Sequence, residues 1–427
     1  MNSIKTARRV CVLLILLACA CSRLTAAQSL PLEWHSFRLN PELNPVVSTG
    51  APLAVRWTFK TGGGISSSPT ISGDVVFIAS NDHRLYALDL RTGRPRWVYT
   101  AENEIMSAPL IVGNLAIVGE GNNYSTNFDP PNYGLLADGA NGLIGVDAST
   151  GKERWKYHLP GSAMPTGAVI DGIIEEHDAA GMLFALNAVD GKYKWRRYLV
   201  SAAAMSAANN FTGKEVVTAG DYPNSVIAFD GTTGRTIWHT EFPPDSSASA
   251  DCPPASDGHA IYGMYFARPA DSKYNFVGFT TPGIEHAYAI NGSNGKIAWD
   301  VPLVRGILPV NNHASIPLIY ENTMFVGSPV SRTLFALDVG SGKIKWKLPV
   351  RGVVQGGLVG DRDQIYFGDR AGFLWAVDAK TGAPLGKIKM KDKFNVGSPI
   401  IVGQTLIIGS GHGYVFAVPI ASFTSHK

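Results

Sequence analysis

One short pattern recurs along the 427-residue chain and constrains its fold more than any other feature. The pattern is a strand, an Asp or Asn, a Gly four residues later and, in six copies, a Trp eight residues later. The copies are LYALDLRTGRPRW at Leu85, LIGVDASTGKERW at Leu143, LFALNAVDGKYKW at Leu183, VIAFDGTTGRTIW at Val226, AYAINGSNGKIAW at Ala287, LFALDVGSGKIKW at Leu334 and LWAVDAKTGAPLG at Leu374. An internal repeat of this kind predicts a modular architecture.

Each part of the pattern has a physical role, which the copy at Leu334 illustrates. Apolar residues on both faces of the positions before Asp338 are typical of a strand buried between two sheets. The Asp338 carboxylate can accept hydrogen bonds from backbone N–H groups two or three residues on, and Gly342 supplies the positive φ that ends the turn. Trp346 begins the returning strand, where its large ring can pack against the adjacent repeat.

Another pair of strands precedes every hairpin. In SSPTISGDVVFIAS (Ser67 to Ser80) the two strands flank a Gly-Asp turn, and SAPLIVGNLAIVG and GSPIIVGQTLIIG repeat this arrangement. Each repeat is therefore a four-stranded unit of about 40 to 60 residues. Such a unit cannot bury both faces alone, whereas radial stacking of several units buries them. The sequence thus predicts an all-β propeller of four-stranded blades.

The two ends of the repeat region predict how the ring closes. The last copy, GYVFAVPIASF, stops before its Gly and Trp, whereas PLAVRWTFKT supplies a lone fourth strand with Trp57. We expect residues near Val55 to Thr61 to complete the last blade of an eight-bladed ring. Residues 51–427 would form a single propeller domain after an N-terminal extended segment at 28–50. A seven-bladed ring would instead leave the Trp-less hairpin at Leu374 outside.

The N-terminal region, residues 1–27, has the composition of a signal peptide. Lys5, Arg8 and Arg9 precede an apolar run from Val10 to Cys21, which is too short for a stop-transfer helix. Small residues end the region, so we expect cleavage after its last alanine and an exported protein, periplasmic or extracellular.

Cys19 and Cys21 allow a second interpretation of this region, as the lipid-attachment site of an outer-membrane-attached bacterial lipoprotein, although neither fits that pattern well. Removing residues 1–27 lowers the formal net charge from +3 to −1, because four cations and no acid are lost. A nucleic-acid partner is not expected of a near-neutral protein. Cleavage after Ala27 leaves Cys252 as the single cysteine, which excludes an internal disulfide.

The pattern Ala-x-Asp-x-x-Thr-Gly-x-x-x-Trp, as at Ala87, Asp89, Thr92, Gly93 and Trp97, resembles the tryptophan-docking repeat of the pyrroloquinoline quinone (PQQ) superfamily. The resemblance covers nearly all of the mature chain and implies the propeller fold. That superfamily includes quinoprotein alcohol dehydrogenases, which are enzymes, and the lipoprotein component of the outer-membrane β-barrel assembly machine, which is a scaffold. The repeat therefore identifies the fold and leaves the function open.

The resemblance also implies where a quinoprotein site would lie. Those enzymes hold a planar quinone over a divalent cation, between a Trp floor and a ceiling of two adjacent bonded cysteines, with an Asp as base. By similarity, Asp221 stands where the enzymes place a metal-binding Asn, and Asp251 is the candidate catalytic base beside Asp245. The mature chain has no adjacent cysteine pair, and Met205 stands where the indole is needed. We therefore expect no cofactor, with PQQ and calcium as the alternative.

Polar residues just before the first strands of blades form a second group of candidates. Asn311, Asn312, His313 and Gln355 occupy positions expected to face the channel mouth, where amides and an imidazole could orient a small ligand or cofactor. Asn395 shares this position. Loop-to-loop hydrogen bonds explain the same residues without a ligand and are the favoured interpretation.

Two further features depart from the repeat. The acidic segment EEHD, Glu175 to Asp178, could bind a cation, although a solvated strand edge is the expected explanation. Met106, Met164 and Met205 recur before three successive blades, where we expect them to fill gaps in the core.

Intact structural repeats beside a degraded cofactor sandwich favour a non-catalytic binding or scaffold protein of the cell envelope. Its loop-decorated mouth, enlarged by insertions that begin at Gly119 and Phe266, would bind an envelope protein or a small ligand. The alternative is a PQQ- and metal-dependent dehydrogenase that oxidises an alcohol or a sugar. A polysaccharide-binding module is a third class.

Overall fold

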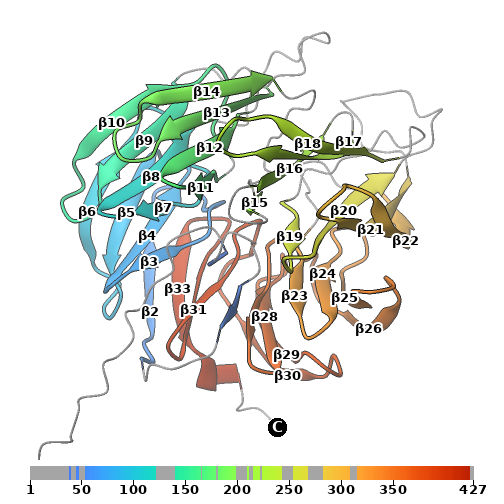
Figure 1. Cartoon of the computed structure of the whole chain (residues 1–427). Helices are drawn as coiled ribbons and strands as arrows, with labels where there is room; N and C mark the ends of the chain where they lie inside the picture. Colours follow the sequence, from blue (N-terminus) through green and yellow to red (C-terminus); the bar gives the residue numbers. More distant parts are fainter. Residues whose placement is uncertain are drawn as a thin grey trace, which may run out of the picture. The chain divides into compact units, whose positions relative to one another are not determined.

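The computed structural model describes residues 38–39, 45–47, 53–121, 140–164, 166–178, 181–198, 209–210, 215–221, 224–242, 253–267, 282–307 and 315–423. These residues form β-strands and one short 3₁₀-helix (Figure 1). Within these ranges no helix has the length and hydropathy needed to span a membrane. The predicted signal peptide lies outside the described residues.

Successive strands pair antiparallel in eight sheets, which are the predicted blades. Blades 1 and 2 contain β3 (Thr70–Ser72), β4 (Val75–Ser80), β5 (Arg84–Asp89), β6 (Pro95–Thr100), β7 (Leu110–Val112), β8 (Leu115–Glu120), β9 (Gly142–Asp147) and β10 (Glu153–His158). Blades 3 and 4 contain β11 (Ala168–Ile170), β12 (Ile173–His177), β13 (Met182–Asn187), β14 (Tyr193–Tyr198), β15 (Asn209–Asn210), β16 (Glu215–Asp221), β17 (Asn224–Asp230) and β18 (Thr236–Glu241).

The second half of the chain repeats this arrangement. Blades 5 and 6 contain β19 (Ala255–Ser256), β20 (Ala260–Ala267), β21 (Gly283–Asn291), β22 (Ile297–Gly306), β23 (Leu318–Tyr320), β24 (Thr323–Gly327), β25 (Thr333–Asp338) and β26 (Ile344–Pro349). Blades 7 and 8 contain β27 (Val359–Asp361), β28 (Gln364–Gly368), β29 (Phe373–Asp378), β30 (Pro384–Lys389), β31 (Ile400–Val402), β32 (Thr405–Gly409) and β33 (Tyr414–Pro419), with β1 (Val46–Val47) and β2 (Trp57–Lys60). The eight-bladed propeller predicted from the repeat is confirmed.

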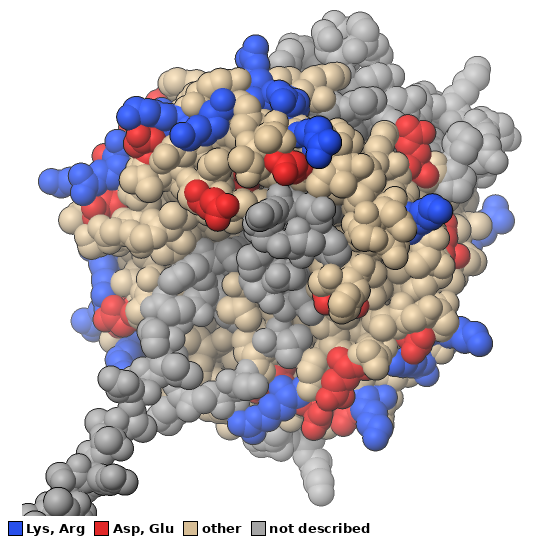
Figure 2. Space-filling view, viewed as in Figure 1, with Lys and Arg blue, Asp and Glu red and all other residues tan. Residues whose placement is uncertain are grey.

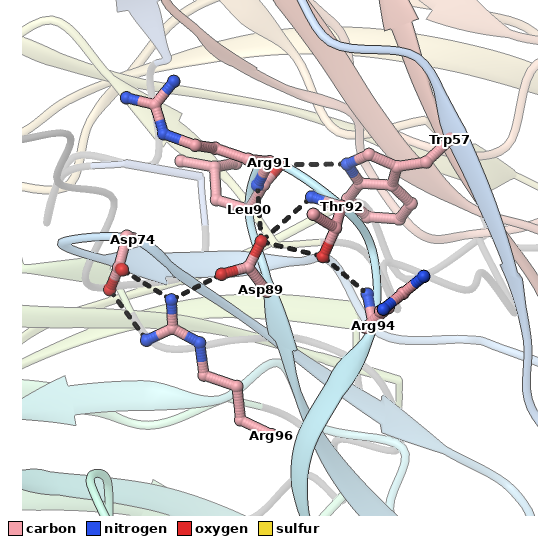
Figure 3. A network of polar contacts seen from close by, with 8 residues as sticks. All are labelled: Trp57, Asp74, Asp89, Leu90, Arg91, Thr92, Arg94 and Arg96. Atoms are coloured by element: carbon pink, nitrogen blue, oxygen red, sulfur yellow. Dashed lines mark hydrogen bonds and ion pairs between the residues drawn. The ribbon is translucent and has the colours of Figure 1, made fainter.

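The hairpin turn of blade 1 shows the repeat's aspartate acting as predicted (Figure 3). Asp89 Oδ1 accepts hydrogen bonds from the backbone N–H groups of Arg91 and Thr92, at 3.1 and 2.9 Å. Its Oδ2 accepts from the Arg96 guanidinium at 2.6 Å. The Arg96 hydrogen bond above all, with the bonds from Thr92, lowers the pKa of Asp89 to about 2. Gly93 ends the turn with a φ of +69°.

The repeat's tryptophan docks on the glycine of the following blade. A Cβ added to Gly93 would lie 2.6 Å from the Trp57 ring, so a glycine is required for the indole to come this close. The Trp57 indole N–H donates to the Leu90 carbonyl at 2.9 Å (Figure 3). The same close approach joins Trp97 to Gly151, Trp155 to Gly191, Trp195 to Gly234, Trp238 to Gly295, Trp299 to Gly342 and Trp346 to Gly382. Each of these contacts fastens one blade to the next.

The N-terminal strand closes the ring as predicted. β2 pairs antiparallel with β33, with Trp57 opposite Ala417 and Lys60 opposite Tyr414, and it completes blade 8. Side chains from blades 1, 7 and 8 pack with Trp57 in one hydrophobic cluster. A strand from before blade 1 and the last strand of the chain are thus held in the same blade.

Blade 7, built on the Trp-less hairpin at Leu374, lies inside the ring, so the seven-bladed alternative is wrong. Gly386 stands where the other copies have tryptophan. The 3₁₀-helix η1 (Ile420–Phe423) packs on β30, and a Cβ added to Gly386 would overlap the Phe423 backbone. The Phe423 ring also meets Tyr366 edge-on, with centroids 5.4 Å apart. The C-terminal turn therefore fills the place of the missing indole.

The predicted extended segment at 28–50 contributes a fifth strand to blade 7. β1 pairs in parallel with β27, with Val46 opposite Gly360. The Pro45 carbonyl accepts a hydrogen bond from the Gly360 N–H at 2.9 Å. β27 is the first strand of its blade and contacts the first strands of blades 6 and 8, which makes it an inner strand. β1 therefore lies at the inner end of blade 7.

The hydrophobic core is divided among the interfaces between blades. β9, for example, is buried at every position. Leu143 packs with side chains of blade 3, whereas Ile144 packs with side chains of blade 1. A strand with a neighbouring sheet on each face needs apolar residues at successive positions, as the repeat indicated.

Gly93→Ala tests the docking contact, with Gly73→Ala as its matched control. Both glycines have positive φ, +69° and +58°, so alanine strains the backbone of each by about 1 to 2 kcal/mol. A Cβ at Gly73 meets no atom within 4 Å, whereas one at Gly93 overlaps the Trp57 ring. We expect Gly93→Ala to lower the free energy of unfolding by about 2 kcal/mol more than the control in chemical denaturation. Equal losses in the two variants would contradict docking.

Candidate functional site

The order of the strands gives the ring two different faces. In each blade the turns after the first and third strands lie at one end, because consecutive strands are antiparallel. The links after the second strand, and those from one blade to the next, begin at the other end. We call this end the loop face. The predicted insertions follow β8 and β20, the second strands of blades 2 and 5, and so leave the described structure at the loop face.

Most candidate residues fall outside the described part of the chain, where they remain predictions. These residues are Cys19, Cys21, Met205, Asp245, Asp251, Cys252, Asn311, Asn312 and His313. Asp221 is the last residue of β16, which places its backbone at the loop face, although its side chain is not among those described.

Gln355 lies in a packed wall and is one of two predicted ligand residues whose side chains are described; the other, Asn395, is half-buried. Gln355 precedes β27 and is 3% exposed. Its neighbours bond to the adjacent blades: the Ser315 hydroxyl donates to the Gly356 carbonyl at 2.8 Å, and the Gly357 N–H donates to the Ser398 hydroxyl at 3.0 Å. Gln355 therefore does not present its amide to open solvent.

A belt of serine and threonine hydroxyls, which the repeat pattern did not predict, links the inner ends of the blades. The Ala108 N–H donates to the Thr166 hydroxyl at 2.8 Å, which joins blades 2 and 3. The Ser398 N–H donates to the Ser68 hydroxyl at 2.8 Å, which joins blades 8 and 1. These residues stand at matching positions two before the first strand of each blade, a signal that aligning the repeats position by position could have found.

Aspartates hold the links of the loop face in place. Asp178 accepts a hydrogen bond from the Gly161 N–H at 3.0 Å, which ties the link inside blade 3 to the link that enters it. Asp369 does the same in blade 7, accepting from the Gly352 N–H at 3.2 Å and from the Trp375 indole at 2.9 Å. These carboxylates serve as structural hydrogen-bond acceptors and position the surface around them.

The solvated edge expected at Glu175–Asp178 is wrong, because all four side chains are buried. The two glutamates and the aspartate are 0% exposed, and the histidine is 1% exposed. Most of the segment belongs to β12, a second strand with a neighbouring blade on each face. Position in the repeat, rather than polarity, decides burial there. Met164, expected in the core, is buried at 2% exposure.

Burial raises the pKa of three carboxyl groups. Among the described residues no hydrogen-bonding or cationic side chain pairs with Glu175 or Glu176. Desolvation raises the pKa of Glu175 to about 9 and holds that of Glu176 well above its usual range. Burial raises the pKa of Glu285 to about 8, although its carboxyl accepts a hydrogen bond from Ser328 at 2.6 Å. At neutral pH the Glu175 and Glu285 carboxyl groups are protonated and can donate a hydrogen bond.

The described tryptophans do not fit the floor of a quinone site. Seven of them dock between blades, as described above. Trp375 stacks on Phe367 with centroids 6.2 Å apart and bonds to Asp369. In the described ranges no three His, Cys, Asp or Glu side chains are grouped to hold a metal ion. The described part of the chain therefore does not build a quinone sandwich, and we derive no redox step from it.

Glu285→Gln tests the buried carboxyl through the pH dependence of stability. The pKa of Glu285 in the folded protein is about 8, above its ordinary value of 4.5. The stability gained from protonating Glu285 is therefore fully present below pH 4.5. This contribution is lost as the pH rises through 8. Glutamine cannot ionise. We therefore expect the melting temperature of Glu285→Gln to fall less than that of wild type between pH 5 and pH 9. The difference corresponds to a free energy of unfolding on the order of 4 kcal/mol. Exposed Glu321→Gln is the control, and parallel curves for wild type and Glu285→Gln would refute the shift.

Comparisons with known proteins agree with this architecture. The chain is 23% identical over 417 residues to the outer membrane protein assembly factor BamB of Burkholderia pseudomallei, covering 95% of this chain and 96% of that protein. It is 24% identical over 377 residues to the tetrathionate hydrolase of Acidithiobacillus ferrooxidans, covering 84% and 74%. The solved quinohemoprotein alcohol dehydrogenase from Comamonas testosteroni matches with a TM-score of 0.68 at 14% identity, over 93% of this chain and 82% of that one, and shows the fold alone.

The family comparison covers most of the chain. Residues 47–132, 130–262 and 268–422 match the model of the family described as outer membrane protein assembly factor BamB. These three stretches reach every blade of the propeller and leave out residues 263–267 of β20. The chain belongs to the BamB family of PQQ-repeat propellers.

Proposed function

We propose that this protein is an exported, non-catalytic scaffold of the cell envelope that binds a partner protein along the outer edge of blade 3. The family match supports an envelope role, because the family is described as outer membrane protein assembly factor BamB. The predicted signal peptide, with cleavage after Ala27 or lipid attachment at Cys19 or Cys21, supports a periplasmic protein, free or attached to the outer membrane. We propose neither a cofactor nor a nucleic-acid partner.

The exposure of β14 is the observation that carries this proposal. Tyr193 is 50% exposed and Tyr198 is 72% exposed, at the two ends of the strand. β14 is the last strand of its sheet, so one row of its N–H and C=O groups faces no further strand. Tyrosine and arginine are enriched at protein interfaces, and an open strand edge can accept an extended segment of a partner.

Positive charge follows the same strand. Lys194, Arg196 and Arg197 form no ion pair with a described carboxylate. The Arg197 guanidinium donates to the Thr233 carbonyl at 2.9 Å and lies 5.8 Å from the centroid of the Trp195 ring. Figure 2 shows lysine and arginine side chains along the edge that β14 forms in Figure 1. A partner segment rich in Asp or Glu would complement this edge.

Charge reversal on β14 tests the proposal in cells. A photo-crosslinking amino acid at position 198, in place of Tyr198, would report contact with an envelope protein. The yield of crosslinked partner is compared between the otherwise wild-type chain and the double variant Arg196→Glu/Arg197→Glu. Lys347→Glu is the control, because Lys347 is exposed on β26 directly after its docking tryptophan, as Arg196 is on β14. We expect the double variant to lose the crosslink roughly tenfold and to assemble less outer-membrane β-barrel protein. Unchanged crosslinking and assembly would overturn the proposal.

The alternative function is PQQ- and metal-dependent oxidation of an alcohol or a sugar, with Asp251 as the base and Asp221 on the metal. The end of β16 at the loop face, where Asp221 stands, supports it, as does the structural similarity to the quinohemoprotein alcohol dehydrogenase. Calorimetric titration of the chain with PQQ and calcium separates the two functions. We expect no detectable heat, whereas tight, metal-dependent binding that is lost in Asp221→Ala would replace the scaffold.

A further inference from the structure

Lysines lie beside two aromatic rings at the loop face of blades 7 and 8. Phe373 is the first residue of β29 and pairs with Lys389 on β30, and Tyr414 is the first residue of β33 and pairs with Lys60 on β2. Third strands begin at the loop face, so both pairs lie there. The matching pairs of blades 1, 2, 3 and 6 are different: Arg84 with Thr100, Gly142 with His158, Met182 with Tyr198 and Thr333 with Pro349.

The two rings hold ammonium groups over their faces. Lys391 Nζ lies 3.8 Å from the centroid of the Tyr414 ring, and Lys60 Nζ lies 5.1 Å from the same centroid. Lys389 Nζ lies 4.9 Å from the centroid of the Phe373 ring. The ring quadrupole attracts a cation in this position without neutralising its charge. Each ring therefore positions positive charge at the loop face.

Lys60 and Lys389 donate their hydrogen bonds to carbonyl oxygens rather than to carboxylates of the described residues. Lys60 Nζ donates to the Thr61 and His412 carbonyls, at 2.9 and 2.6 Å. Lys389 Nζ donates to the Ala371 carbonyl. A neutral acceptor fixes the position of an ammonium group and leaves its net charge in place. The lysines can therefore attract an anion from outside the chain.

Further cations extend this charge along the loop face of blades 6 to 8. The links that leave these blades at the loop face are residues 327–333, 350–358, 368–373, 389–399, 409–414 and 60–69. They contain seven lysines or arginines, which we call the basic rim: Lys60, Arg332, Arg351, Arg370, Lys389, Lys391 and Lys393. All are exposed except Lys393, which is half-buried.

Acidic side chains do not balance the basic rim at the surface. The same links contain two acids, Asp369 and Asp392, which are 0% and 8% exposed. Asp369 accepts from the Trp375 indole, as described above, and Asp392 accepts from the Ser410 hydroxyl at 2.6 Å. On the same face, the link from blade 1 to blade 2 carries Glu102 and Glu104 and no lysine or arginine. The loop face is therefore positive along one arc of the ring.

The composition of the basic rim favours a membrane surface over a protein partner. Four of its seven members are lysines, whose compact charge on a flexible stem contacts anions without the fixed geometry of an arginine fork. Lysine is depleted at protein interfaces, whereas clusters of lysine and arginine attract the head groups of anionic lipids. The half-buried Tyr414 ring beside the lysines is of the kind that lies at head-group depth.

We propose that the basic rim binds the head groups of anionic phospholipids and places the loop face of blades 6 to 8 against a membrane. Phosphate oxygens of the lipid would accept hydrogen bonds from the ammonium and guanidinium groups of the rim. The contact is peripheral and electrostatic, and no part of the chain enters the bilayer core. The rim uses no residue of β14, so this surface is independent of the proposed partner surface.

Co-sedimentation of the mature chain with lipid vesicles tests the basic rim. One set of vesicles is pure phosphatidylcholine, and the other contains phosphatidylcholine and phosphatidylglycerol in equal parts. We expect binding to the anionic vesicles alone, and we expect added sodium chloride to weaken it, because salt screens exposed charges. Lys389→Glu/Lys391→Glu should lower the apparent affinity by roughly tenfold or more, because two attractive charges become repulsive.

Lys343→Glu/Lys380→Glu is the matched control. Both lysines are exposed in turns after the third strands of blades 6 and 7, at the end of the blades opposite the loop face. The control changes the net charge by the same amount as the rim variant does, so we expect it to bind anionic vesicles nearly as wild type does.

The melting temperature without vesicles separates a loss of binding from a loss of folding. If the glutamate variant melts early, Lys389→Gln/Lys391→Gln removes the two charges and keeps side chains of similar shape, and it should still bind more weakly than wild type. Equal binding of wild type to neutral and anionic vesicles would overturn the proposal, as would equal losses in the rim variant and the control. Binding to polyglutamate without binding to anionic vesicles would also overturn it, because the rim would then fit an acidic protein segment.

Discussion

The contact of each tryptophan with the glycine of the next blade is the interaction on which the rest of the structure depends. No blade has a core of its own, since the apolar clusters lie between blades and each buried strand serves two of them. The positive φ of a residue such as Gly93 brings the turn within reach of the indole, and the absent Cβ lets the ring approach. Through Trp57 on β2, the same contact joins blade 8 to blade 1 and closes the ring.

Residues that bind other molecules are therefore expected outside the docking contacts. The indoles of the described residues are engaged in packing. Glu175, Glu176 and Glu285 are buried within the blades, where burial raises their pKa and makes stability depend on pH. The departures from the repeat that lie outside these contacts are the links of the loop face and the charged edge of β14, which we propose as the partner surface.

The sequence predicted the ring because its repeated residues act locally, through turns and contacts with the next copy. It did not predict contacts made by residues that lie outside the repeats. Phe423, which follows the last repeat, replaces the missing indole at Gly386, and Arg38, which precedes the first repeat, lies against Gly357. Burial of Glu175–Asp178 was mispredicted because polarity outweighed position in the repeat. Of the predicted site, Gln355 proved to be buried, and Asp221 is placed by its backbone alone.

Amide hydrogen exchange in Trp57→Ala tests the central claim most directly, namely that each blade is held by docking on its neighbour. In a ring of this kind, removing one contact exposes the blades that it joins before the others. We expect faster exchange in β2, β31 to β33 and β3 to β6, with β20 and β21 of blade 5 protected as in wild type. Exchange that accelerates equally in all blades, or in β2 alone, would contradict this claim.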